Sequence, residues 1–234
     1  MNGRRRTLPT VSVSWAGKIL TIFKKEMLSE FRTRYAFNAI IMFSLVTLTV
    51  VSFSLGISRP GPEVMAALFW IILFFAAASG LAQVFVKEEE ARTAGFLRLY
   101  APATAVLIGK IIFNLFLLIC MTVLLVPLYI ILLDTVPQNF ILFLMGLLLG
   151  IIGLAGSTTI IAAIVSRASI KGALFAVLSF PVLLPLLVAA IEITLVSFTG
   201  GNFAAAGSAL QLLLAYDVVM LTLSIMLFDF VWQL

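Results

Sequence analysis

Six long apolar stretches recur along the chain, separated by short segments that carry charged residues, prolines or glycines. They cover residues 37–57, 64–86, 105–133, 140–165, 172–196 and 209–231. A helix of about 20 apolar residues crosses the hydrocarbon core of a bilayer, which is roughly 30 Å thick. The stretches are continuously apolar rather than alternating, which favours helices over a membrane β-barrel. The pattern predicts an all-α, polytopic membrane protein with six transmembrane helices.

A shorter periodic segment precedes the first apolar stretch. Its apolar residues are Trp15, Ile19, Ile22, Phe23 and Met27, and its polar residues on another face are Lys18, Thr21, Lys25, Ser29 and Arg32. Such spacing predicts an amphipathic helix that lies along the cytoplasmic membrane surface or, alternatively, packs as a soluble helix on a partner. We expect residues 1–36 to form a cytoplasmic tail with this interfacial helix, and residues 37–234 to form the transmembrane domain.

Composition and charge agree with a membrane protein and suggest its orientation. Of the 234 residues, 63% are hydrophobic and 11% are charged, which is more apolar surface than one soluble core can bury. Every Lys and Arg except Arg59 falls on one side, in the amino-terminal segment, between Lys87 and Lys110, or at Arg167 and Lys171. Because translocation of basic loops is disfavoured, both termini are expected in the cytoplasm of a prokaryotic cell, with the spans in its inner membrane. The net charge of +5 suits anionic membrane lipids and requires no nucleic acid.

The chain lacks the side chains on which most enzyme and cofactor sites depend. It contains no histidine, which removes the ordinary general base, the common metal ligand and the usual axial haem ligand. Neither Gly17–Lys18 nor Gly109–Lys110 has the flanking residues of a phosphate-binding loop. The single cysteine, Cys120, lies in the third apolar stretch as a small packing residue. We expect no enzyme activity, no nucleotide site and no directly bound metal or cofactor.

Two acidic residues fall inside apolar stretches, where a charge is costly and often functional. Glu192 lies near the outer end of the fifth stretch, and Asp217 about a third of the way into the sixth from the outside. One hypothesis is a polar vestibule lined by both carboxyl groups. The alternative places Glu192 at the head-group boundary and Asp217, neutral and hydrogen-bonded, within the bundle. We expect no basic partner for them within the spans, which argues against a proton-driven carrier.

Small residues and prolines mark the fourth and fifth spans. One face of the fourth carries Gly146, Gly150, Gly153 and Ser157 at helical spacing. Small residues allow close approach of another helix, and we prefer this packing role to ligand binding. Pro181 and Pro185 lie one turn apart in the fifth span. Each removes a backbone donor, which predicts a kink or a local break that is either a static bend or a gating hinge.

Charge is concentrated between the second and third spans. The residues of interest there are Glu88, Glu89, Glu90, Arg92, Gly95, Phe96, Leu97, Leu99 and Tyr100. The three glutamates stand where a helix would begin, and Glu88 and Arg92 are four residues apart. Ala101–Pro102 would end the helix. We expect one short helix, with an acidic start and an aromatic tip, that docks on a soluble protein. Alternatively, its apolar side chains enter the membrane interface.

The order of these features resembles the permeases of the ABC-2 type. More closely, the chain is similar to the haem exporter protein B family (CcmB) of the cytochrome c maturation system. Three stretches carry the resemblance: LRLYAPATAVLIGKIIFNL from Leu97, SRASIKGALFAVLSFPVLLPLLVAAIEIT from Ser166, and AYDVVMLTLSIMLFDFV from Ala215. The similarity extends from about Trp15 over nearly the whole chain.

The resemblance implies a permease subunit, paired as a homodimer, that binds a separate ABC-type ATPase resembling CcmA. It implies that ATP binds to this partner, that Glu88 to Tyr100 form the coupling helix, and that haem is transported or released with its chaperone. CcmC-like and CcmD-like membrane proteins and a CcmE-like haem chaperone would complete the system. An ABC-2 permease for a lipid or drug is the alternative, and a membrane scaffold or energy-independent channel is a third.

Overall fold

The computed structural model describes residues 14–56, 60–166, 168 and 171–233 of the chain. These residues form helices and loops, with no strand among them. The helices in chain order are α1 Trp15–Thr33, α2 Tyr35–Leu55, α3 Pro62–Leu81, α4 Val86–Glu90, α5 Ala94–Tyr100, α6 Ala103–Leu133, α7 Phe140–Val165, α8 Lys171–Phe198 and α9 Gly207–Gln233. The expectation of an all-α protein is confirmed.

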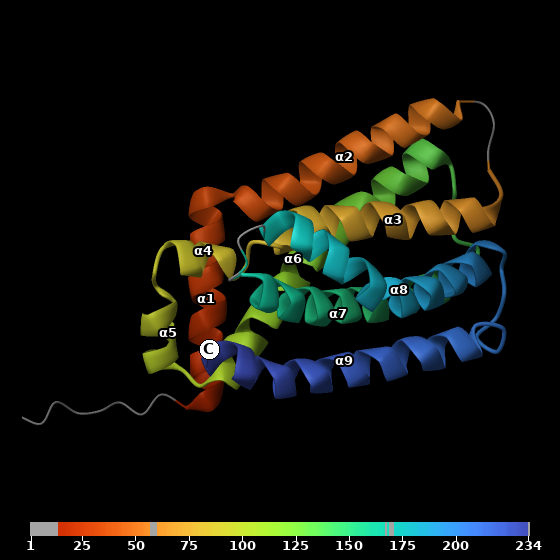
Figure 1. Ribbon diagram of the computed structural model, residues 1–234. Helices are drawn as coiled ribbons and strands as arrows, with labels where there is room; N and C mark the ends of the chain where they lie inside the picture. Colours follow the sequence, from red (N-terminus) through yellow and green to blue (C-terminus); the bar gives the residue numbers. More distant parts are fainter. Residues whose placement is uncertain (1–13, 57–59, 167, 169–170, 234) are drawn as a thin grey trace, which may run out of the picture.

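Six helices are long and apolar enough to cross a membrane: α2, α3, α6, α7, α8 and α9. Each coincides with one predicted apolar stretch, so the prediction of a multi-pass membrane protein is confirmed. These helices run in roughly one direction, whereas α1 crosses their ends (Figure 1). In the same view, α4, α5 and the end of α9 lie at this end of the bundle. We call this the α1 end of the bundle.

Helix α7 occupies the centre of the bundle and contacts α3, α6, α8 and α9. Its glycines lie against bulky neighbours on α3 and α8. A Cβ at Gly150 would stand 2.7 Å from Trp70 Cζ3, and a Cβ at Gly146 would stand 3.2 Å from Ile193 Cβ. Real Cβ atoms need more room than this, so the missing side chains are what allow these helices to approach each other.

We expect Gly150→Ala to destabilise the bundle, because the added methyl would overlap the ring of Trp70, which is fully buried. Overpacking of this kind costs about 1–3 kcal/mol. Thermal unfolding in detergent measures the loss. Gly207→Ala is the matched control, since a Cβ there meets no atom within 4 Å. Equal unfolding temperatures for the two variants would contradict the close packing at Gly150.

Pro181 and Pro185 lie inside α8, which is helical on both sides of them. The local break that the sequence allowed is therefore absent from α8. Figure 1 shows instead that the helix changes direction along its length. A bend follows from the two missing backbone donors and from the clash of each proline ring with the preceding turn. Whether the bend also serves as a hinge stays a prediction.

Helix α1 packs along the start of α6. Ile22 is buried, and a Cβ at Gly109 of α6 would stand 2.9 Å from Ile22 Cβ. Phe23 meets Phe116 edge to face, with 6.2 Å between the ring centroids. Other large apolar residues of α1 remain exposed, namely Trp15, Leu20, Leu28 and Phe31. An amphipathic helix at a membrane surface has this distribution, but α1 also buries two acids, Glu26 and Glu30.

Candidate coupling site at the α1 end

The charged segment forms two short helices, α4 and α5, rather than one helix from Glu88 to Tyr100. Arg92 adopts the left-handed conformation with φ of 54°, and the Thr93 N–H donates to Glu88 O at 3.0 Å. A left-handed residue followed by such a bond is a common way to end a helix. The prediction of one continuous helix is therefore wrong, because the turn at Arg92 closes α4 before α5 begins.

The two short helices expose their apolar residues unequally. Phe96 is 76% exposed, Leu99 88% and Tyr100 42%. Leu97 is instead half-buried and packs on the hydrophobic cluster beneath α5. Gly95 is exposed, and a Cβ there would meet no atom within 4 Å. The apolar surface is thus narrower than the sequence suggested, and we call Phe96, Leu99 and Tyr100 the α5 tip.

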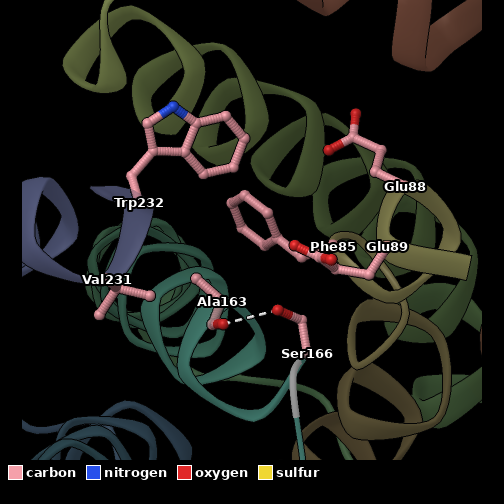
Figure 2. Close-up of a pocket in the computed structure, with 7 residues that line it drawn as sticks. All are labelled: Phe85, Glu88, Glu89, Ala163, Ser166, Val231 and Trp232. Atoms are coloured by element: carbon pink, nitrogen blue, oxygen red, sulfur yellow. Dashed lines mark hydrogen bonds between the residues drawn. The ribbon is translucent and has the colours of Figure 1, made fainter. Parts of the chain in front are cut away.

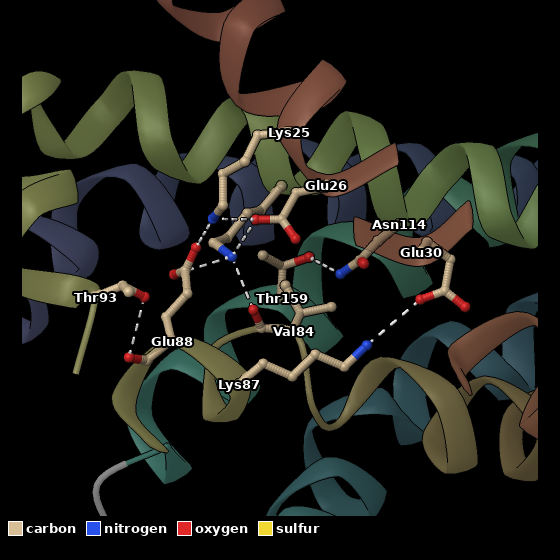
Figure 3. Close-up of polar contacts among 10 residues, drawn as sticks. Lys25, Glu26, Glu30, Val84, Lys87, Glu88, Thr93, Asn114 and Thr159 are labelled. Carbon is tan, nitrogen blue, oxygen red and sulfur yellow. Dashed lines mark hydrogen bonds and ion pairs between the residues drawn. The ribbon is translucent and has the colours of Figure 1, made fainter. Parts of the chain in front are cut away.

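A group of charged side chains, all buried except Lys25, ties α4 to α1 and α6 (Figure 3). Lys110 of α6 has no solvent exposure, and its Nζ lies 2.8 Å from Glu26 Oε1 and 2.8 Å from Val84 O. Glu88 Oε2 lies 3.1 Å from the same Nζ, an ion-pair contact that is not aligned as a hydrogen bond. Lys25 pairs with both carboxylates. We call Lys25, Glu26, Glu88 and Lys110 the Lys110 cluster.

Opposite charges favour the ionised forms of Lys25 and Glu26, whose pKa values shift in opposite directions. Burial alone would lower the pKa of Lys25, but attraction to Glu26 and Glu88 is stronger and raises the pKa above its ordinary value. Burial would raise the pKa of Glu26, but Lys110 and Lys25 hold the pKa below its ordinary value. Ion pairs in such a poorly hydrated place are strong, and removing one partner leaves an uncompensated charge.

A second ion pair fastens α4 to α1 and brings in the start of α2. Lys87 Nζ lies 3.4 Å from Glu30 Oε2, and it stands 5.4 Å from the centroid of the Tyr35 ring. The other oxygen of Glu30 accepts a hydrogen bond from the Phe37 N–H at 2.9 Å. Helix α4 is therefore held against three neighbouring helices by charged side chains.

On its other side, the segment meets the end of α9 around Trp232 (Figure 2). The Arg98 guanidinium of α5 lies 5.3 Å from the Trp232 ring centroid, and the Phe85 ring centroid is 6.2 Å from that of Trp232. A small hollow beside them is lined by Phe85, Glu88, Glu89, Ala163, Ser166, Val231 and Trp232. A displacement of α4 and α5 would thus reach α1, α6 and α9 together.

The sequence pattern did not identify Lys25, Glu26 or Lys110 as site residues. The signal was present, because Lys110 falls five residues inside the third apolar stretch, where a lysine needs a buried partner. The charge distribution assigned Lys110 to the loop between the second and third spans, whereas it lies within α6. The spacing of Glu88 and Arg92 is typical of a contact within one helix, but no such contact is found among the described residues. Glu88 instead contacts Lys25 and Lys110, and Arg92 is exposed at the turn.

Glu192 and Asp217 have different surroundings. Glu192 is exposed on α8, whereas Asp217 of α9 is 4% exposed and lies against Gly153 and Leu186. Among the described residues, neither carboxylate oxygen of Asp217 has a hydrogen-bond partner. The structure therefore does not bring both acids to one polar surface, and the hydrogen bond expected for a buried Asp217 is not found within the described part of the chain.

Six helices long and apolar enough to cross a membrane, with α1 across one end and a charged segment tied to it, define a polytopic membrane protein. The family model described as CcmB protein matches residues 17–230. The chain belongs to the CcmB protein family, as the three stretches of sequence indicated. This family implies the permease subunit of a haem exporter for cytochrome c maturation, which is not itself an enzyme. No curated protein compared with the chain matches it.

Proposed function

We propose that this chain couples ATP hydrolysis by a separate, CcmA-like ATPase to haem export or to release of the haem-loaded chaperone. It acts as a homodimer in the prokaryotic inner membrane, with the α1 end and both termini in the cytoplasm. CcmC-like and CcmD-like membrane proteins and a CcmE-like chaperone are its further partners. The positive-inside distribution of Lys and Arg supports this orientation.

The exposure of the α5 tip is the observation that carries the proposal. Phe96 and Leu99 project from a helix of seven residues that lies outside the six spans. Exposed apolar residues rimmed by charge are typical of protein docking surfaces. Glu89, Glu90 and Arg92 supply the charged rim, and Gly95 leaves room beside the tip for a partner.

The Lys110 cluster mechanically connects the docking surface to the membrane-spanning helices. When the ATPase closes on nucleotide, it would push on α5, and α4 would transmit the push to α1 and α6 through the buried ion pairs. The contact of Arg98 with Trp232 would carry the same motion to α9. The bend at Pro181 and Pro185 is the hinge we propose within α8. Movement of packed helices around such contacts is a usual form of switching.

Haem enters this proposal as substrate rather than as a resident cofactor. The sequence has no histidine, so a ligand to the iron from this chain would be Met, Tyr or Cys. Such ligation is unusual, which favours a partner subunit as the holder of the iron. Glu192 and Asp217 stay candidates for polar contacts along a substrate path.

Deletion of the gene and complementation with variants tests the proposal. We expect c-type cytochromes to disappear on deletion and to return only when the co-expressed ATPase can hydrolyse ATP. Haem-stained gels of membrane proteins measure the result. Normal c-type cytochromes with impaired lipid or drug export would favour an ABC-2 permease for another substrate. Full complementation with an ATPase that cannot hydrolyse ATP would favour a scaffold or channel.

A further inference from the structure

A groove of about 340 Å³ opens between α1, α2 and α6, apart from the Lys110 cluster. This volume falls within the range of small-ligand pockets, roughly 300–1,000 Å³. Its walls are apolar and are formed by Met27, Phe31, Phe37, Phe116, Leu117 and Cys120. Hydrocarbon is the natural occupant of such walls.

On α6, the groove is lined by Phe116, Leu117 and Cys120, which cover about one turn, or roughly 6 Å, of the helix. Arg34 lines the same groove from the junction of α1 and α2. The apolar wall and this cation therefore belong to one continuous surface.

An exposed cation, Arg34, lines the groove, and we call its surroundings the mouth. Arg34 connects α1 to α2 in the left-handed conformation, with φ of 50°, which glycine or asparagine adopts more easily. Its backbone is fixed by hydrogen bonds, as the N–H donates to Glu30 O at 2.6 Å and the C=O accepts from the Asn38 N–H at 3.0 Å. Among the described residues, no ion pair or hydrogen bond involves its guanidinium.

The other polar groups at the mouth do not oppose an anion. Asn38 lines the groove one helical turn after Arg34 and offers an amide donor. Glu30 also lines it, but its carboxylate is compensated by Lys87 and by the Phe37 N–H. The mouth is thus cationic, whereas the interior is apolar.

We propose that this groove binds one anionic phospholipid, with the phosphate on Arg34 and one acyl chain extending to Cys120. A guanidinium binds phosphate through paired hydrogen bonds, and basic pockets between membrane helices bind lipid head groups. A free anion would leave the apolar walls uncovered, and a second copy of the chain would have to bury the Arg34 charge. The lipid would hold α1 and α2 in their present arrangement, independently of the ATPase and of the transported substrate.

The only cysteine of the chain, Cys120, reports on occupancy because it forms part of the groove wall. We expect phosphatidylglycerol added to the detergent-solubilised protein to slow alkylation of Cys120 by N-ethylmaleimide about tenfold, saturably and more than phosphatidylcholine does. Native mass spectrometry should show one retained phosphatidylglycerol per chain. In Arg34→Gln, protection should fall to the level given by phosphatidylcholine.

Arg32→Gln is the matched control, because Arg32 is exposed on α1 and does not line the groove. Arg34→Lys keeps the charge, so phosphatidylglycerol should still partly protect Cys120 in this variant. Partial protection in Arg34→Lys together with its loss in Arg34→Gln would show that the charge, rather than misfolding, is responsible. Full protection of a folded Arg34→Gln protein by phosphatidylglycerol would overturn the proposal. So would protection by inorganic phosphate alone, which indicates a free anion, or lipid-independent protection that rises with protein concentration, which indicates a second copy.

Discussion

The double variant Phe96→Asp, Leu99→Asp is expected to lose the ATPase during purification while its membrane bundle folds as before. Both side chains are more than three-quarters exposed, so aspartates there disturb little in the isolated chain. As anchors in an ATPase groove, each would contribute about 2 kcal/mol or more to binding. Losing both weakens the complex by about a thousandfold. Co-purification from solubilised membranes with a tagged chain measures this.

Val136→Asp provides the matched control for this double variant. Val136 is 63% exposed in the loop between α6 and α7, and it too changes from apolar to acidic. This control should retain the ATPase. Leu97 of α5 is a poor choice for the test, because its side chain packs on the buried apolar cluster and its replacement would disturb the fold. An ATPase that stays bound to the double variant would contradict docking on the α5 tip.

Lys110→Met is expected to destabilise the protein by about 3–5 kcal/mol, the usual loss when one partner of a buried ion pair is removed. Glu26 and Glu88 would then share only Lys25, which is partly exposed, and their charges would repel each other in a place with little water. Thermal unfolding in detergent measures the loss. Lys24→Met is the control, since Lys24 is an exposed neighbour on α1.

A triple variant separates stability from coupling. Lys110→Met combined with Glu26→Gln and Glu88→Gln removes one positive and two negative charges, so no carboxylate in the cluster remains unpaired. Neutral replacements of buried ion pairs often restore stability. We expect this variant to fold and to retain the ATPase, yet to give less c-type cytochrome, because α4 is no longer tied to α6 by charge. Unaltered stability in Lys110→Met, or normal cytochrome levels in the triple variant, would contradict the role assigned to the cluster.

The six spans were predictable because each is a local property of the sequence. An apolar stretch of more than 20 residues must be helical in a membrane whatever its neighbours are, since its backbone groups have no other partners there. The small face of α7 was also predictable, since Gly146 and Gly150 share a side of any helix. The residues that these glycines contact were not predictable, because Trp70 and Ile193 come from distant parts of the chain.

The contacts of the charged segment could not be predicted from local sequence patterns. Three glutamates, an arginine at i+4 and a later proline indicated one helix with an internal ion pair. The chain instead turns at Arg92, and Glu88 pairs with lysines 63 residues before it and 22 residues after it. Ion pairs between helices depend on how those helices pack, and no periodicity within one segment reports that arrangement.

By itself, the sequence determined that this protein is an all-helical membrane subunit with six spans and an acidic, apolar segment between two of them. The length of an apolar stretch and the charge of a loop are local properties of the sequence. Each determines directly how that segment interacts with the bilayer, so both can be predicted without the tertiary structure. Only the tertiary structure decided that Lys110 is buried among carboxylates, that the exposed tip reduces to Phe96, Leu99 and Tyr100, and that Arg34 stands at the mouth of an apolar groove. These features depend on which helices are neighbours, because burial and pairing are properties of the packed bundle.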